Sequence, residues 1–230
     1  MNVGLKDKFH GCVAGSYIGS AMGAAVEGLR WQEIEEKHGF LRTLEPYQHY
    51  GNVWLRPAGT TEEGVERQKR LAAAIIEKQD RITGEDVMSR WLADDTVEGM
   101  RMLSEPFELR ALEMARVGVP ARDLGGYSDF TGHVAFAAAC HPLGLINAGN
   151  PDAALEDVLE VGQIFQAANS KGLLWSVVTG VGVAEATRPS ASVDSVLGAI
   201  LDRCDPTWVA KELDRHLQST AHIGEATELR

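Results

Sequence analysis

Cysteine is scarce in this sequence of 230 residues, where it occurs at positions 12, 140 and 204. Three cysteines are odd in number and widely separated, so they do not make a disulfide framework. They also form no C-x-x-C pair, which is the usual signature of a structural zinc site. This pattern favours a reducing environment, and we therefore expect the protein to be cytoplasmic.

Lysine and arginine are also few relative to aspartate and glutamate. The chain has 22 lysine and arginine residues against 33 aspartate and glutamate residues, which gives a formal net charge of −11. A surface of that sign repels phosphate backbones and anionic lipid headgroups. We therefore expect neither a nucleic acid nor a membrane among the partners of this protein.

Long apolar runs are missing, apart from one between residues 11 and 26. This run is short for a membrane span of about 20 residues, and it is poor in leucine. It also follows Asp7 and two lysines, a flank that does not suit a transmembrane helix. We interpret the run as a helix buried in the core, and a cleaved export signal is the alternative.

Strand signals are lacking too, because no run of alternating apolar and polar residues is bounded by turns. Helical periodicity dominates instead, with Thr83, Asn150 and Ser192 as recognisable N-caps. The sequence therefore predicts an all-α, globular protein. Helices are expected near residues 5–27, 31–39, 60–78, 83–93, 107–117, 151–168, 171–187, 192–203 and 206–219.

Glycine, by contrast, is regularly placed in the stretch GCVAGSYIGSAMGAAVEG, residues 11–28. Gly11, Gly15, Gly19 and Gly23 are four residues apart and so share one face of a helix. Each glycine costs about 1 kcal/mol relative to alanine in an exposed helix, so the repeat calls for a reason. We expect a groove that lets a neighbouring backbone approach a crowded, central helix. Taken alone, the stretch is explained by packing without any function.

A second stretch, RPAGTTEEGVERQ, places the adjacent carboxylates Glu62 and Glu63 after Thr60 and Thr61. One interpretation is structural, with a threonine hydroxyl capping the helix and the glutamates interacting with its positive end. The other is a hard-metal site, because Mg²⁺ prefers oxygen ligands. Neighbouring side chains on a helix diverge by about 100°. The two glutamates would therefore bind two ions, or lie in two coordination shells, more easily than they would chelate one ion.

Together these stretches resemble the ADP-ribosylglycohydrolase family, which includes the dinitrogenase reductase-activating glycohydrolases. Residues 11–28 follow the family pattern G-x-x-x-G-x-A-x-G-D-A-x-G-x-x-x-E-G at most positions. GTTEEG, residues 59–64, stands where the family has T-D-D-T. HPLGLINAGNPDAAL, residues 141–155, is similar to the family segment P-[IL]-G-L…G-[DN]-P-x-x-A. The resemblance covers about residues 8 to 200.

The resemblance implies a fold, a cofactor and a reaction. The fold would be a compact orthogonal multi-helix bundle, with residues 1–230 in a single domain. Thr61, Glu62 and Glu63 match the family's ligands of one or two Mg²⁺ ions, which orient the ribose hydroxyls. The implied reaction is hydrolysis of an N- or O-ribosyl bond in an ADP-ribosylated protein or a smaller nucleoside-like compound.

The resemblance also implies roles for individual side chains. Glu27, Glu62 and Glu63 would be catalytic, because carboxylates stabilise the positive charge of an oxocarbenium-like ribose. Glu27 would face the substrate from the end of the glycine helix. The implied substrate-binding residues are Ser20, Glu27, His133 and His141. For His133 and His141, a structural role inside the fold is the competing interpretation.

Several positions depart from the family pattern. Ser20 stands where the family has aspartate, Glu62 and Glu63 replace two aspartates, and Gly64 replaces the second threonine. A late D-x-D-[ST] motif, which completes the family's metal site, is missing after Asp194. We therefore expect the domain to be incomplete at its C-terminus, to be completed by another segment or a second chain, or to have lost the metal site.

These departures leave two further functions open. A diverged member could bind a ribosyl ligand, or catalyse a different reaction on one, without the original hydrolase activity. A helical subunit could instead function only with a partner that completes its fold.

Two other patterns are weaker candidates. Asp94-Asp95-Thr96 repeats part of T-D-D-T, but it follows a predicted helix instead of starting one, and we interpret it as a cap or surface loop. Cys140 beside His141 suggests a nucleophile and its base, but adjacent side chains usually point apart.

Overall fold

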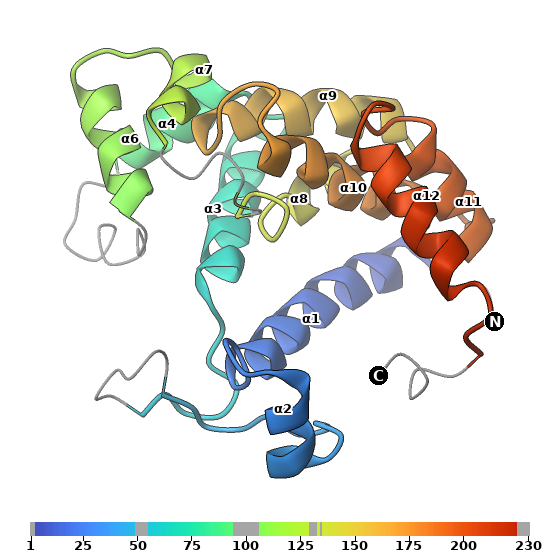
Figure 1. Cartoon of the computed structure of the whole chain (residues 1–230). Coiled ribbons are helices and arrows are strands. Elements are labelled where there is room, and N and C mark those ends of the chain that lie inside the picture. The colour runs from blue at the N-terminus through green and yellow to red at the C-terminus, as the bar shows by residue number, and fades with distance from the viewer. Residues whose placement is uncertain (1–2, 49–54, 94–105, 129–132, 134, 225–230) are drawn as a thin grey trace.

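The structure is a computed structural model that describes residues 3–48, 55–93, 106–128, 133 and 135–224. Every regular element within these ranges is a helix, as Figure 1 shows. Extended pairing in the described part is an isolated antiparallel bridge between Tyr47 and Arg56. The all-α prediction is therefore confirmed.

The predicted helices are present, but the one expected over residues 151–168 ends at Val161 and is followed by a short 3-10 turn to Ile164. Gly39 ends the second helix with a φ of 62°, and the side chains of Asn150 and Ser192 accept hydrogen bonds from the first turns of their helices, as predicted. Three short elements were not predicted: α7, η1 and α8. The observed elements are α1 (Leu5–Ala24), α2 (Trp31–His38), α3 (Glu63–Lys78), α4 (Gly84–Ala93), α6 (Pro106–Arg116), α7 (Ala121–Leu124), η1 (Gly125–Tyr127), α8 (His141–Ile146), α9 (Pro151–Val161), η2 (Gly162–Ile164), α10 (Lys171–Ala186), α11 (Val193–Leu201) and α12 (Val209–Thr220).

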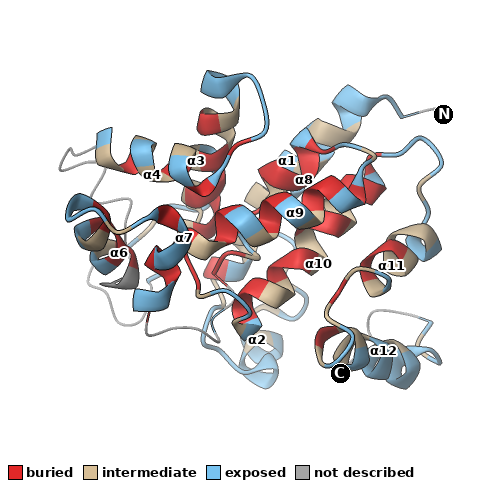
Figure 2. Ribbon diagram, turned by 90° about the horizontal axis from the view of Figure 1, so that it is seen from above, coloured by how far each residue is buried: buried red, intermediate tan, exposed pale blue. Residues whose placement is uncertain are grey.

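The core extends from α3, α4, α6 and α7 through α8, α9 and α10 to α11 and α12. The helices α8, α9 and α10 carry much of the buried surface in Figure 2. Their backbones approach closely at glycines. A Cβ added to Gly144 would lie 2.7 Å from the carbonyl oxygen of Gly180, and one added to Gly180 would lie 2.4 Å from Val158. The close helix contacts of this fold therefore depend on Gly144 and Gly180.

The expectation that the glycine face of α1 is buried is wrong. Gly11, Gly15, Gly19 and Gly23 are all exposed, and a Cβ added to any of them would meet nothing within 4 Å. The reason is that α1 contacts α3 and α8 with its other side, where Ala21 and Ala24 are the buried residues. Its glycine face therefore packs against nothing in the described part of the chain.

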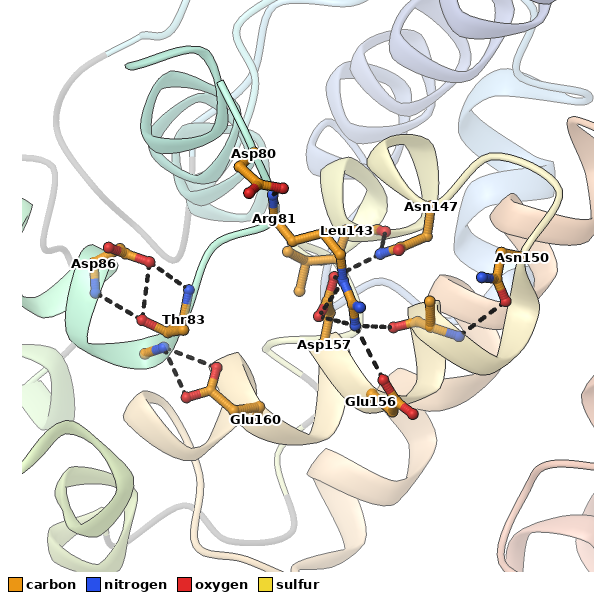
Figure 3. A network of polar contacts seen from close by, with 12 residues as sticks. Asp80, Arg81, Thr83, Asp86, Leu143, Asn147, Asn150, Glu156, Asp157 and Glu160 are labelled. Carbon is orange, nitrogen blue, oxygen red and sulfur yellow. Dashed lines mark hydrogen bonds and ion pairs between the residues drawn. The ribbon is translucent and has the colours of Figure 1, made fainter. Parts of the chain in front are cut away.

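A polar network joins the end of α3 and the start of α4 to α9 (Figure 3). The Arg81 side chain donates to both carboxylate oxygens of Asp157, with one Nη2–Oδ1 distance of 2.6 Å. Asp157 also accepts from Asn147 Nδ2 at 2.6 Å. Glu160 accepts from the Gly84 backbone N–H at the beginning of α4. These contacts position α3, which carries one side of the site described below.

None of the helices in the described part of the chain combines the length and the apolar character that a membrane crossing requires.

Candidate functional site

A pocket of about 350 Å³ lies between the C-terminal half of α1, the start of α3 and the segment that leads into α8. Its polar lining includes three carboxylates and an imidazole. Five of the seven residues predicted for the site line it: Ser20, Glu27, Glu62, Glu63 and His141.

The other two predicted residues are not part of this lining. Thr61 is half-buried and directly precedes Glu62. The His133 side chain is exposed, and its backbone carbonyl accepts a hydrogen bond from the Gln166 side chain. The structure thus brings together the residues from α1, α3 and α8, but it leaves His133 outside the pocket.

The start of α3 is held by α1 instead of by a threonine cap. Glu62 is the N-cap residue and has no side-chain capping bond, while its backbone N–H donates to Ser20 Oγ at 3.0 Å. Thr60 Oγ1 donates to the Pro57 carbonyl at 2.7 Å. The interpretation that a threonine hydroxyl caps this helix is therefore wrong. Ser20, which lines the pocket, instead connects α1 to the start of α3.

Glu62 is bound by two donors from the loop between α2 and α3. Arg56 Nη1 lies 3.0 Å from Glu62 Oε1, and the Tyr47 hydroxyl donates to the same oxygen. Arg56 Nη1 also lies 3.2 Å from the Tyr47 hydroxyl. Burial and the hydrogen bond to Glu62 raise the pKa of Tyr47, so the phenol stays protonated and remains a donor.

The contribution of Tyr47 and Arg56 to the site could not be predicted from the sequence. Both lie in an irregular segment, nine residues apart, and they match no motif. Two backbone hydrogen bonds pair them, from Tyr47 N to Arg56 O at 3.1 Å and from Arg56 N to Tyr47 O at 2.8 Å. Pairing of this kind depends on the path of the loop, which helical periodicity does not report.

Glu63 also faces an arginine. Arg67, one turn later on α3, has Nη1 3.8 Å from Glu63 Oε1. Arg67 is buried, and its Nε lies 2.6 Å from Oε1 of the buried Glu108. This buried pair fixes Arg67 behind the pocket, where it lowers the negative potential around Glu63.

Placed in this way, these residues do not fit the divalent metal ion that the resemblance implies. Glu62 Oε1 already accepts from two donors, and each of the two carboxylates faces a guanidinium. Among the residues that the structure describes, no group of three or more histidine, cysteine, aspartate or glutamate side chains could hold a metal ion. Mg²⁺ requires oxygen ligands in near-octahedral geometry, which Glu62 and Glu63 alone do not supply.

His141 borders the pocket from the first residue of α8. Burial lowers its pKa against a smaller opposing effect of the Ala138 backbone, so the imidazole is neutral near pH 7. Its Nδ1 atom is buried and has no hydrogen-bond partner among the described residues. An unsatisfied buried polar atom is costly, so His141 is suited to receive or donate a hydrogen bond when a polar ligand binds.

Gln68 and Gly64 shape the side of the pocket formed by α3. Gln68 Nε2 donates to the Ala138 carbonyl at 2.8 Å, and its Oε1 accepts from Ser16 Oγ at 3.0 Å. A Cβ added to Gly64 would lie 2.9 Å from the Cβ of Ala138. The replacement of the family's second threonine by Gly64 therefore has a structural reason, because Ala138 occupies the space of that side chain.

A second hollow of about 410 Å³ adjoins the pocket and shares Ala24 and Glu27 with it. Tyr47, Lys37 and His38 also line this hollow. Because Tyr47 binds Glu62, the Tyr47–Glu62 contact lies between the two hollows. Together they offer room on both sides of Glu27.

The weaker candidates do not contribute to this site. Cys140 is fully buried, and burial raises the pKa of its thiol to about 12, so it is not a thiolate nucleophile. Asp94-Asp95-Thr96 lies outside the described residues.

Comparison with known proteins identifies the family of this chain. A family model described as ADP-ribosylglycohydrolase matches residues 1–229. A protein of Archaeoglobus fulgidus, described as an uncharacterized protein, is 27% identical over 144 residues, which are 62% of this chain and 44% of that protein. The chain thus spans less than half the length of the relative that it matches. The match along nearly the whole sequence establishes that this chain belongs to the ADP-ribosylglycohydrolase family.

Proposed function

We propose that this protein is a hydrolase that binds a ribosyl group in the pocket between α1 and α3 and cleaves its N- or O-glycosidic bond. The observation that carries the proposal is the convergence of Glu27, Glu63 and His141 on one pocket of about 350 Å³. These three residues come from separate parts of the sequence. Their meeting in a concave site fits the family to which the chain belongs.

The chemistry of the lining suits this reaction. Cleavage of a ribosyl bond develops positive charge at the anomeric carbon, and fixed carboxylates stabilise that charge. Glu27 and Glu63 would supply the negative charge. The neutral imidazole of His141 would bind a ribose hydroxyl, which would also satisfy its buried Nδ1 atom. Ser20 would act indirectly, because it holds the start of α3.

The substrate class follows from the space around Glu27. A ribose would occupy the pocket, and the group attached to it would extend into the adjoining hollow beside Lys37 and His38. ADP-ribosylated protein and a smaller nucleoside-like compound both fit this description. The resemblance implies magnesium dependence, with Thr61, Glu62 and Glu63 as ligands. Arg56 already pairs with Glu62 at 3.0 Å, so the proposed reaction depends on the side chains of the pocket alone.

A hydrolysis assay tests the proposal. Wild-type protein should release ribose or ADP-ribose from a panel of ADP-ribosyl and nucleoside substrates, as measured by chromatography. Glu63→Gln should lower the rate by about 100-fold or more, because it removes a charge that acts in the transition state. Glu77→Gln is the matched control, since Glu77 lies at the far end of α3 and is 71% exposed.

One observation favours a second candidate, a diverged member that binds a ribosyl ligand without hydrolysing it. Arg56 and Arg67 partly neutralise the two glutamates of α3, which weakens their support for a cationic transition state. A protein that binds ADP-ribose but releases no product from any substrate in the panel would identify this alternative.

We also propose that another polypeptide segment, from a second chain or a continuation of this one, covers α1. Val13 and Ile18 are 45% and 52% exposed, and an apolar hollow runs along the same helix. The four glycines beside them leave space for a close helix contact. Exposed apolar surface next to such a groove is typical of an interaction site.

A further inference from the structure

We propose that the guanidinium of Arg56 is the resident cation of this site, so that the pocket binds its ligand without a divalent metal ion. The inference deepens the proposed function. Its second experiment, calorimetry with ADP-ribose, rests on that function. It departs from the magnesium site that the resemblance implies, and it is drawn from the contacts of Arg56 in this chain.

The backbone of Arg56 is held in place independently of the contacts that its side chain makes. The paired hydrogen bonds with Tyr47 hold both residues in a two-residue antiparallel bridge. The Tyr47 side chain is 5% exposed and therefore anchors this bridge against the fold. The backbone of Arg56 is thus held next to Glu62 by the fold, and its side chain is 34% exposed.

The side chain is then oriented by three contacts. The guanidinium carbon lies 5.6 Å from the centre of the Tyr47 ring, within the range of a cation–π interaction. Nη1 donates to the Tyr47 hydroxyl and to Glu62 Oε1. A guanidinium keeps its positive charge throughout the pH range in which proteins are folded. The result is a cation held against Glu62 at 3.0 Å.

A divalent ion would have to displace this arrangement. To bind Glu62 Oε1 it would break the contacts with Arg56 and Tyr47, and it would then lie within a few ångströms of a positive charge. Glu63 does not offset this repulsion, because Arg67 lies 3.8 Å from it. Arg67 cannot move away easily, since it is buried in an ion pair with Glu108. Two arginines thus supply the positive charge that metal ions would bring.

Titration with Mn²⁺, followed by the electron paramagnetic resonance signal of the free ion, tests this proposal. Wild-type protein and the control Arg90→Gln, a surface arginine on α4, should show no saturable binding. Arg56→Gln should acquire a saturable site and bind at least about tenfold more ion than wild type at the same free Mn²⁺ concentration, because Glu62 Oε1 is released. The double variant Arg56→Gln, Glu62→Gln should lose that site again. Circular dichroism checks that each variant is folded, and Arg56→Lys, which keeps the charge, should behave as wild type.

Two results would overturn the proposal. One is saturable Mn²⁺ binding by the wild-type protein that Glu62→Gln abolishes. The other is an Arg56→Gln variant that is folded and still binds no Mn²⁺, because Arg56 would then not be the group that excludes the ion.

Calorimetry with ADP-ribose separates this proposal from the proposed function. Equal affinity in EDTA and in Mg²⁺ supports both. Binding that requires Mg²⁺ overturns the role of Arg56 and keeps the ribosyl site. Absence of binding under both conditions, together with the Mn²⁺ results expected above, leaves Arg56 as the resident cation and rejects the ribosyl ligand.

Discussion

At the scale of single residues, the most consequential contact behind the site is the buried ion pair of Arg67 and Glu108. Both side chains are almost fully buried, and Arg67 is the residue that faces Glu63. A buried charge is tolerated only while its partner remains. The electrostatics of the pocket therefore depend on a residue that does not line it.

Replacing Glu108 by glutamine should destabilise the protein by about 3–5 kcal/mol, because it leaves a buried guanidinium without a countercharge. Urea unfolding followed by circular dichroism measures the change. Glu77→Gln breaks an exposed contact with Arg90 and should change stability by less than about 1 kcal/mol. Equal effects of the two substitutions would show that the Arg67–Glu108 pair is not buried as described.

His141 gives the protein a dependence on pH. Burial lowers its pKa below the value of an unfolded histidine, about 6.5. The unfolded state therefore binds more protons than the folded state in this region, so stability is fully present above about pH 6.5 and is lost as the pH falls through the folded pKa. In His141→Gln the loss of stability between pH 7.5 and 5.5 should be smaller than in wild type.

Urea unfolding at the two pH values measures this difference. His222→Gln, at an exposed position, should keep the pH dependence of wild type. A dependence that is unchanged in His141→Gln would mean that the imidazole is not desolvated in the folded protein.

At the scale of elements, the glycines of this chain fall into two classes. Those of α1 have open space beside them, whereas Gly144 of α8 packs against the backbone of Gly180. The sequence cannot separate these classes, because glycines of both classes lie in helices. What separates them is the direction from which other helices approach.

Gly15→Ala should therefore stabilise the isolated chain by about 0.5–1 kcal/mol, since alanine is the better helix former and its Cβ meets nothing. Gly144→Ala should destabilise it by about 1–3 kcal/mol, because its Cβ would overlap the Gly180 carbonyl oxygen. Thermal unfolding of both variants measures the contrast. A destabilising Gly15→Ala in the isolated chain would mean that this face of α1 is covered within the chain itself.

Much of the helical fold could be predicted because its signals are local. The caps at Asn150 and Ser192 and the stop at Gly39 act within one turn, so they are visible in the sequence. The short helix α8 was missed because six residues do not establish a period. The glycine face was misjudged because burial depends on neighbours that lie far away along the chain.

The site was predictable to a similar extent. Glu27, Glu62 and Glu63 could be found from motif spacing, since two helix ends carry them into one pocket. Arg56 and Tyr47 could not be found, because their contact with Glu62 arises from a loop pairing without periodicity or motif. They change the chemistry most, since both of them donate to Glu62 Oε1.

At the scale of the whole molecule, the exposed face of α1 predicts association. If another segment covers this helix, the mass of the native particle should exceed the 24.9 kDa of one chain in sedimentation equilibrium. Ile18→Glu places a charge on the exposed face and should return the particle to a single chain without loss of stability. A stable particle of 24.9 kDa in the wild-type protein would contradict the association.

The central claim is that the pocket between α1 and α3 holds a ribosyl ligand, and two glycines on one face of α1 test it most directly. Gly19 lines the pocket, whereas Gly11 lies two turns away on the same face and outside it. Calorimetry with ADP-ribose should give saturable binding to wild type and to Gly11→Leu, and no binding to Gly19→Leu, whose side chain would fill the pocket. Equal binding by the two leucine variants, or none by the wild type, would contradict the account.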